Sequence, residues 1–211
     1  MTFETVIFAA GIGSRLGEFG TKMPKALLPV WRNDGCLEPI LIKLISQSVN
    51  AGTSKVYVIT NHCSKDIDNL LEKYREKFEV PIQTVLQKEL NGEAGGLFYI
   101  KDIKHPILAL DGDNYLTNDG FFLELLSCYS NNDCLATIGV MEVPDIHRYA
   151  NVKISSDYSL LDIIEKPKKG MEFGNIAKMG CYVLSPQLIS KGKDFFRDAD
   201  SNIATTAAFS N

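Results

Sequence analysis

The strongest constraint on the fold is a regular alternation of short apolar runs with amphipathic stretches. Five apolar runs have the length and boundaries of buried strands, at residues 5–10, 56–60, 82–86, 107–111 and 136–141. Helical patterns lie between them, at 39–49, 64–77, 93–101 and 120–129. A β-α-β rhythm places successive strands side by side with helices on both faces. The chain is therefore predicted to be an α/β protein with a Rossmann-like, doubly wound, mostly parallel sheet.

The rhythm changes in the last third of the chain. Residues 151–155 and 160–165 flank a polar turn at Asp157, which predicts a β-hairpin. A strand at 181–184 and a helix starting at Pro186 follow. No repeat or low-complexity linker interrupts the 211 residues, so we expect one domain (1–211) that carries a small hairpin subregion.

Composition excludes several classes of function. A net charge of −4 offers no basic surplus for a nucleic-acid backbone, and no apolar run approaches the roughly 20 residues of a membrane span. The N-terminus lacks a basic and apolar leader, so a cytoplasmic location is expected. The cysteines are odd in number and scattered, which is typical of reduced thiols (Cys36, Cys63, Cys128, Cys134, Cys181). The histidines have no metal-ligand spacing (His62, His105, His147).

A glycine-rich turn follows the first predicted strand. Gly11, Gly13 and Gly17 give the spacing G-x-G-x-x-x-G, which matches neither the dinucleotide fingerprint nor the Walker phosphate loop. Gly11 and Gly13 allow positive φ, which lets backbone N–H groups approach an anion closely. The turn therefore predicts phosphate binding, with a plain tight turn as the alternative.

Two cations accompany this turn. Arg15 lies inside it and offers a planar, bidentate donor for phosphate. Lys25 follows ten residues later, directly after Pro24, whose ring restricts the backbone there. A surface arginine would explain Arg15 alone, but the Pro-Lys element strengthens the phosphate interpretation.

The segments A-A-G-I-G-S-R-L-G and M-P-K-A-L-L-P-V resemble the opening signature of the sugar-1-phosphate nucleotidyltransferases. The resemblance implies coupling of an NTP with a sugar 1-phosphate to give an NDP-sugar and pyrophosphate, by Mg²⁺-dependent in-line attack on the α-phosphorus. It gives catalytic roles to Arg15 and Lys25. It also implies that one group of turn residues binds the nucleotide: Ala10, Gly11, Gly13 and Ser14.

A second segment, Q-K-E-L-N-G-E-A-G-G-L from Gln87, is similar to the family's Q-x4-G-[TL]-A segment. The resemblance implies that Gln87 and Gly92 bind the nucleotide base. An amide offers both donors and an acceptor to a base edge, while glycine permits close backbone approach. Without the neighbouring motifs, Gln87 would be interpreted as an exposed strand end.

A third segment, D-G-D-N from Asp111, follows a buried strand at the edge where α/β sheets bind ligands. Carboxylates in this position suit Mg²⁺, which prefers oxygen ligands and bridges phosphates. The family's G-D-N motif implies that Asp113 is both the metal ligand and a catalytic residue. Asp111 is interpreted as auxiliary or structural.

A fourth segment runs from R-Y-A-N-V at Arg148 to I-E-K-P at Pro167 and resembles the family's sugar-phosphate segment. It implies sugar-phosphate binding by Ala150, Glu165 and Lys166. The similarity divides the chain into an NTP-binding part at about 1–140 and a sugar-phosphate-binding part at about 141–211. A last segment, M-G-C-Y-V-L-S-P, resembles a family strand.

The sequence departs from the family pattern at three places. Ala150 replaces a glycine, and Lys178 stands where asparagine is usual. We also expect this chain to lack the family's C-terminal strand with its second metal-binding aspartate, and that role is not transferred to Asp198 or Asp200. The base and the sugar are left open, and Lys178 is interpreted either as a contact for a more acidic substrate or as a side chain that points away from it.

Two other functions are considered. A phosphocholine cytidylyltransferase shares the opening signature and a D-A-D-N-Y-L segment, although the intact E-K-P motif favours a sugar acceptor. A non-catalytic nucleotide-binding subunit is the alternative from a different class. An NAD-dependent dehydrogenase fits poorly. The expected partners are an NTP and a sugar 1-phosphate, with homo-oligomer formation left open.

Overall fold

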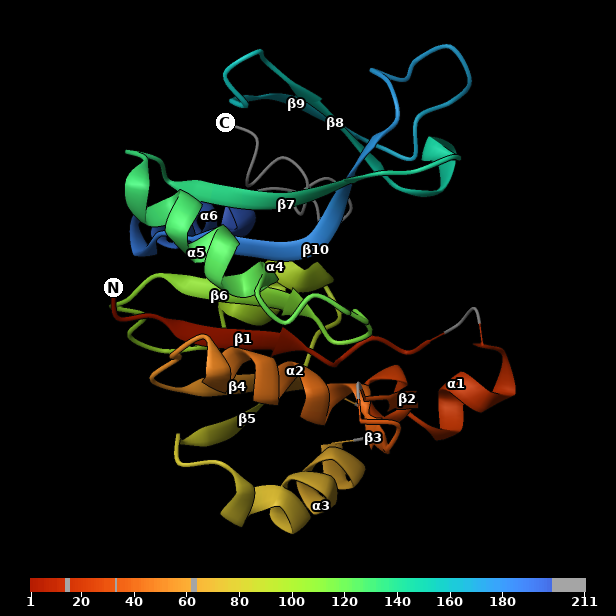
Figure 1. Cartoon of the computed structure of the whole chain (residues 1–211), viewed down its shortest axis with the longest axis vertical. Helices are drawn as coiled ribbons and strands as arrows, with labels where there is room; N and C mark the ends of the chain where they lie inside the picture. The colour runs from red at the N-terminus through yellow and green to blue at the C-terminus, as the bar shows by residue number, and fades with distance from the viewer. Residues whose placement is uncertain (14–15, 33, 62–63, 199–211) are drawn as a thin grey trace.

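A computed structural model describes residues 1–13, 16–32, 34–61 and 64–198. Its main sheet has the strand order β5-β4-β1-β6-β10-β8-β9, and β7 also pairs with β10 (Figure 1). The strands are β1 (Glu4–Phe8), β4 (Val56–Thr60), β5 (Ile82–Leu86), β6 (Ile107–Asp111), β7 (Ala136–Glu142), β8 (Ala150–Ile154), β9 (Leu160–Glu165) and β10 (Ile176–Leu184). The predicted α/β class is confirmed.

The parallel half of the sheet consists of β5, β4, β1 and β6. Strand β10 then runs antiparallel to β6, β7 and β8, and β8 pairs antiparallel with β9 as the predicted hairpin. The sheet is thus mixed, with a parallel core, rather than mostly parallel throughout. The reason is that the β6-α5-β7 crossover leaves a space between β6 and β7, which β10 fills from the opposite direction.

Helices cover both faces of the sheet (Figure 1). One face packs against α2 (Ile40–Asn50), α3 (Ser64–Tyr74) and α5 (Phe121–Asn131). The other packs against α4 (Gly92–Leu97) and α6 (Pro186–Asp198). This two-sided cover buries most of β1, β4 and β6, whose sequences are correspondingly apolar, whereas the edge strand β5 is partly exposed and contains Gln83 and Thr84.

Several element boundaries differ from prediction. Strand β1 ends at Phe8, two residues early, because the chain leaves the sheet to form the glycine-rich turn. Helix α3 ends at Tyr74 and continues as the 3₁₀ turn η3 (Arg75–Lys77). Helix α4 ends at Leu97, well short of the predicted end at 101. Strand β10 begins at Ile176, five residues earlier than predicted.

The segment between the glycine-rich turn and α2 forms elements that the sequence did not predict. It contains α1 (Glu18–Lys22), the 3₁₀ turn η2 (Lys25–Leu27) and a two-stranded sheet of β2 (Pro29–Trp31) and β3 (Leu37–Pro39). These strands are too short and too rich in proline to give a periodic signal. A further 3₁₀ turn, η4 (Ile146–Arg148), precedes β8.

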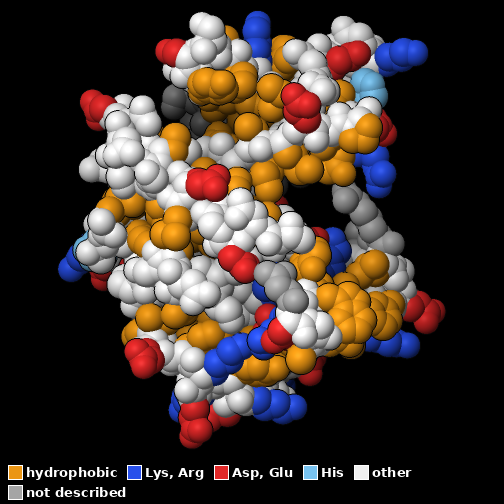
Figure 2. Space-filling model, viewed as in Figure 1, with side chains coloured by type: hydrophobic (Ala, Val, Ile, Leu, Met, Phe, Trp, Pro, Cys, Tyr) orange, Lys and Arg blue, Asp and Glu red, His pale blue; other side chains and the backbone are white. Residues whose placement is uncertain are grey.

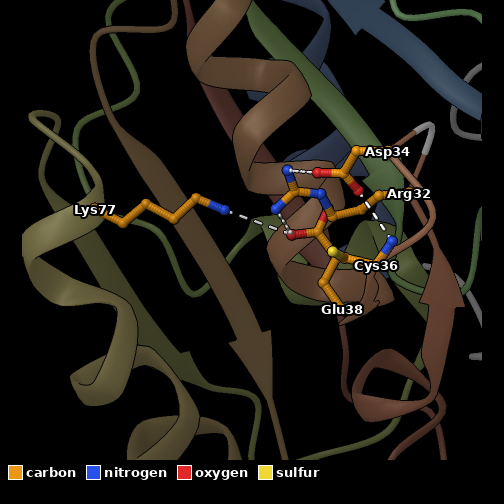
Figure 3. Close-up of polar contacts among 5 residues, drawn as sticks. All are labelled: Arg32, Asp34, Cys36, Glu38 and Lys77. Atoms are coloured by element: carbon orange, nitrogen blue, oxygen red, sulfur yellow. Dashed lines mark hydrogen bonds and ion pairs between the residues drawn. The ribbon is translucent and has the colours of Figure 1, made fainter.

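An ion-pair cluster joins the small sheet to the end of α3 (Figure 3). The Glu38 carboxylate on β3 lies 3.9 Å from Arg32 and 3.5 Å from Lys77, and Arg32 also pairs with Asp34. The backbone N–H of Cys36 donates to Asp34 and, together with the nearby Arg32, lowers the pKa of that carboxyl. Glu38 is only 7% exposed. We call Arg32, Asp34, Glu38 and Lys77 the Glu38 cluster.

The remaining expectations from the sequence concern the cysteine thiols, a membrane-spanning helix and the C-terminal tail. Within the described ranges Cys36, Cys128, Cys134 and Cys181 are free thiols, as expected. A search of the same residues finds no helix with the length and apolarity needed to span a membrane. Residues 199–211, which include Asp200, lie outside the described residues, as do His62 and Cys63.

Candidate active site

A cleft with a volume of about 960 Å³ opens at the carboxyl ends of the parallel strands. Segments that follow β1, β5 and β6 form one wall, and residues of β8, β9 and β10 face them. Figure 2 shows the surface hollowed between the part that carries β8 and β9 and the arm that carries α1. Tertiary structure therefore brings together the four sequence segments that the motif analysis selected.

The glycine-rich turn lines the cleft through Ala10, Gly11 and Gly13. Gly13 uses the freedom that glycine gives and has a φ of 69°, whereas Gly11 does not have a positive φ. Gly20 of α1 packs directly on the turn, because a Cβ there would lie 2.2 Å from the Gly13 carbonyl oxygen. Ser14 and Arg15, the other predicted site residues of this turn, lie outside the described residues.

Lys25 and Asp113 meet across 88 positions of sequence. The Lys25 Nζ donates to the Asp113 carboxylate at 2.8 Å, with the two side chains 31% and 45% exposed. Pro24, at φ −60° and ψ 139°, presents Lys25 at the start of η2. The backbone before Asp113 is held in place by a hydrogen bond, because the Gly112 N–H donates to the Phe8 carbonyl oxygen at 2.9 Å. A Cβ at Gly112 would lie 2.5 Å from that oxygen.

Gln87 lies in the cleft wall but is 3% exposed, so it is not the exposed strand end considered from sequence. Its Nε2 donates to Asn91 Oδ1 and to the Gly92 carbonyl, both at 3.0 Å. Gly92 has a φ of 89°, a conformation that favours glycine. The loop therefore fixes the Gln87 amide before any ligand arrives, and leaves its carbonyl oxygen as the group suited to accept from a base N–H.

The hairpin segment contributes Ala150, Glu165 and Lys166 to the cleft lining. Ala150 is directly opposite Glu165 in the β8–β9 register, and the Lys166 Nζ lies 3.6 Å from the Glu165 carboxylate. Lys166 has a φ of 44°, an uncommon conformation for a residue with a side chain. Its N–H donates to the Tyr149 carbonyl, which helps to hold this geometry.

A hydrogen bond from His147 fixes the segment after the E-K-P motif. The His147 Nδ1 lies 2.8 Å from the Pro167 carbonyl oxygen, and because a carbonyl only accepts, this nitrogen carries the proton. The contact joins η4 to the end of the hairpin, and both flank the cleft. It gives this histidine a positioning role that its sequence context did not suggest.

A group of charged residues on the cleft floor was not assigned a role from sequence. The Tyr182 hydroxyl lies 2.7 Å from Glu93 Oε2 and 3.2 Å from Asp111 Oδ1, so it bridges the two carboxyl groups. Lys178 Nζ lies 5.0 Å from the centroid of the Tyr182 ring. Burial, together with the nearby Glu93, raises the pKa of Asp111 to about 7, while Lys178 acts to lower it.

Gly180 makes room for this arrangement. A Cβ at that position would lie 1.9 Å from Asp111 Oδ2, so the Asp111 carboxyl packs directly on the glycine backbone. The structure therefore gives Asp111 a buried place beside β10, although sequence analysis left it as auxiliary or structural. The available signal was the presence of charge at positions 93 and 178, where the family pattern has none.

The cleft offers only a few groups that could bind a divalent metal ion. The described part of the chain holds no group of three or more His, Cys, Asp or Glu residues placed to bind an ion. Asp113 nevertheless presents a half-exposed carboxylate at the strand end, beside the glycine-rich turn. Mg²⁺ commonly uses one or two carboxylates and completes its coordination with substrate phosphates. The residues present fit such a partial site.

The chain belongs to the nucleotidyl transferase family, whose model matches residues 4–208. It is a sugar-phosphate nucleotidyltransferase, an enzyme of NDP-sugar synthesis, as the motifs predicted. It is 28% identical over 213 residues to a UTP–glucose-1-phosphate uridylyltransferase of Staphylococcus epidermidis strain RP62A, covering 88% of this chain and 72% of the relative. A second such enzyme, from Staphylococcus saprophyticus, is 27% identical with the same coverage.

Solved structures agree on the fold. A UDP-glucose pyrophosphorylase complexed with UDP-glucose superimposes with a TM-score of 0.77 at 20% identity, covering 92% of this chain and 80% of the other. An apo UDP-glucose pyrophosphorylase gives 0.80 at 18% identity, covering 100% and 86%. At this identity the likeness concerns the fold, and the residues of the site are argued from this chain alone.

Proposed function

We propose that the enzyme acts by in-line attack of a sugar 1-phosphate oxygen on the α-phosphorus of an NTP, with pyrophosphate as the leaving group. The observation that carries this proposal is the convergence of the Lys25–Asp113 pair and the Glu165–Lys166 pair on one cleft. Positive charge on both walls suits a reaction between two polyanions.

The nucleotide would occupy the wall formed by the glycine-rich turn and the Gln87 loop. Backbone N–H groups near Gly11 and Gly13 would receive phosphates, and Gln87 with Gly92 would contact the base. The neighbouring Ala10 and Ser14 would shape the same subsite, and Arg15 would stabilise phosphate charge in the transition state. The roles of Ser14 and Arg15 rest on their sequence motif alone.

The sugar 1-phosphate would lie against the hairpin. Glu165 would accept hydrogen bonds from sugar hydroxyls, Lys166 would pair with the phosphate, and Ala150 would border the ring. Because a phosphate monoester is already largely ionised near neutral pH, it needs no general base to attack. Lys25 would hold the reacting phosphates together, which reduces the cost of orienting them.

Asp113 is the described residue that would hold Mg²⁺. When bound, Mg²⁺ supplies positive charge that offsets the charge developing on the phosphate oxygens. Before metal and substrate bind, Lys25 neutralises the same carboxylate. Exchange of partners between Lys25, Asp113 and the phosphates is therefore the rearrangement expected on substrate binding.

The test is pyrophosphate release with Mg²⁺ across a matrix of NTPs and sugar 1-phosphates, with phosphocholine as one further acceptor. UTP with glucose 1-phosphate is tried first, since the named relatives are uridylyltransferases of glucose 1-phosphate. Release that depends on one NTP–sugar pair and is lost in Lys25→Met supports the proposal. Release with phosphocholine alone would contradict it and identify a cytidylyltransferase-type acceptor.

A further inference from the structure

Three residues of β10 meet beneath the cleft: Lys178, Gly180 and Tyr182. The strand shifts its register against β7 between Lys178 and Tyr182, and the Lys178 Nζ lies 5.0 Å from the centroid of the Tyr182 ring. The Asp111 carboxyl fills the space over Gly180 and meets the Tyr182 hydroxyl. Lys178 is half-buried, lies over the Tyr182 ring and lines the cleft. Its ammonium is therefore held at a fixed place and does not extend freely into solvent.

This place is at the hairpin end of the cleft. The residue before Lys178 pairs with Asn151 of β8, next to Ala150, and Lys178 itself pairs with Val140 of β7. Glu165 and Lys166 face the same space from β9. Lys178 thus belongs to the subsite in which the acceptor, not the nucleotide base, is proposed to bind.

The cationic side chains that line the cleft differ in whether they have a carboxylate partner. Lys25 has Asp113 as its partner and Lys166 has Glu165. Among the described residues, neither Lys178 nor Arg148, which also lines this end, forms an ion pair with a carboxylate. Asp111 offsets part of the charge of Lys178 from below, but its carboxyl is committed to Tyr182 and packed on Gly180. Glu93 also lines the cleft, so the described cations and carboxylates of the lining are equal in number. Lys178 and Arg148 are the described lining cations that remain able to pair with an anionic group of an acceptor.

We infer that Lys178 is a specificity-determining residue that selects acceptors carrying a second negative charge, such as a hexuronic acid 1-phosphate, over neutral and cationic ones. The inference rests on the proposed function. An ammonium held over an aromatic face favours an anionic substituent on the acceptor. It also repels a positively charged substituent on the acceptor, which disfavours cationic acceptors.

The experiment compares kcat/KM for three acceptors with the best NTP: glucose 1-phosphate, glucuronic acid 1-phosphate and glucosamine 1-phosphate. The wild-type enzyme is expected to prefer the carboxylate over the ammonium acceptor by at least tenfold. In Lys178→Asn, which restores the residue usual in the family, this ratio is expected to fall at least tenfold. Lys104→Asn makes the same charge change on an exposed loop before β6, away from the cleft, and is expected to keep the wild-type ratio.

The outcomes separate the inference from the function on which it rests. Sugar-dependent pyrophosphate release with an equal fall for all three acceptors in Lys178→Asn would give Lys178 a structural role and overturn the inference alone. No release with any sugar 1-phosphate would overturn the function itself. If Lys178→Asn does not fold, the wild-type ratio is measured against KCl concentration, since screening should reduce a charge-based preference. A ratio independent of salt would again overturn the inference.

Discussion

Two regions of this molecule gather lysine or arginine around carboxylates, and they differ in exposure. In the active-site cleft, the paired side chains of Lys25, Asp113, Glu165 and Lys166 are 31–52% exposed and border a large cavity. In the Glu38 cluster, one carboxylate is almost completely buried and receives cations from two separate segments (Figure 3). The cleft pairs can exchange partners with a ligand, whereas Glu38 is committed to the fold.

Because of this difference in exposure, the ion pairs of the two regions are expected to contribute to different properties, the cleft pairs to catalysis and the Glu38 cluster to folding stability. Exposed ion pairs contribute little to folding because water already solvates both partners. Removing one partner of a buried pair costs more, since the remaining group loses its compensation. We therefore expect mutations in the cleft to affect turnover and mutations in the Glu38 cluster to affect stability.

Asp113→Asn should reduce turnover by about 10²–10³-fold, or about 3–4 kcal/mol of transition-state stabilisation, because it removes the carboxylate proposed to hold Mg²⁺. Its free energy of unfolding should change by less than about 1 kcal/mol, since the pair with Lys25 is exposed. Pyrophosphate release and urea denaturation measure the two effects. An active variant would show that the metal is held elsewhere.

Gly112→Ala should damage both properties, because its Cβ would meet the Phe8 carbonyl oxygen at 2.5 Å. We expect a destabilisation of about 1–3 kcal/mol from the forced backbone shift, together with loss of turnover as Asp113 moves. The stability control is Gly11→Ala, since a Cβ at Gly11 meets nothing within 4 Å. Equal unfolding free energies for the two variants would show that the β1–β6 contact tolerates displacement.

Asp111→Asn tests the buried carboxyl on the cleft floor. The pKa of Asp111 is raised from 3.8 to about 7, so in that window the folded protein binds a proton that the unfolded chain does not. The contribution of the Asp111 carboxyl to the stability of the wild-type protein is therefore fully present below about pH 4 and is lost as the pH rises through 7. Without divalent cations, the variant should gain about 1–3 kcal/mol relative to wild type between pH 4 and pH 8. A pH-independent difference in urea denaturation would contradict this.

Glu38→Gln should destabilise the protein by about 1–2 kcal/mol, because it removes the carboxylate shared by Arg32 and Lys77. Turnover should remain within about twofold of wild type, as the cluster does not line the cleft. Glu72→Gln is the matched control: its pair with Arg75 is 68–75% exposed, so its effect should stay below about 0.5 kcal/mol. A large loss of turnover in Glu38→Gln would remove the separation between the two regions.

Local patterns were sufficient for much of this structure. Strands Val56–Thr60, Ile82–Leu86 and Ile107–Asp111 have the predicted boundaries. The first and the last are buried apolar runs, and the edge strand Ile82–Leu86 is rich in residues that favour strands. The hairpin of β8 and β9 was also predicted, from two runs around a polar turn. The motifs selected residues from four segments, and the described ones line one cleft.

The sequence alone was enough to predict most of the local elements, because periodicity and turn residues act over a few positions. Its motifs were enough to predict the family. Tertiary structure alone decided that β10 enters the sheet antiparallel beside β6. That placement puts Gly180 against Asp111, and Tyr182 between Asp111 and Glu93. These contacts join positions 71 and 89 residues apart, so no local pattern could reveal them. The charge and pKa of the cleft floor depend on such long-range neighbours.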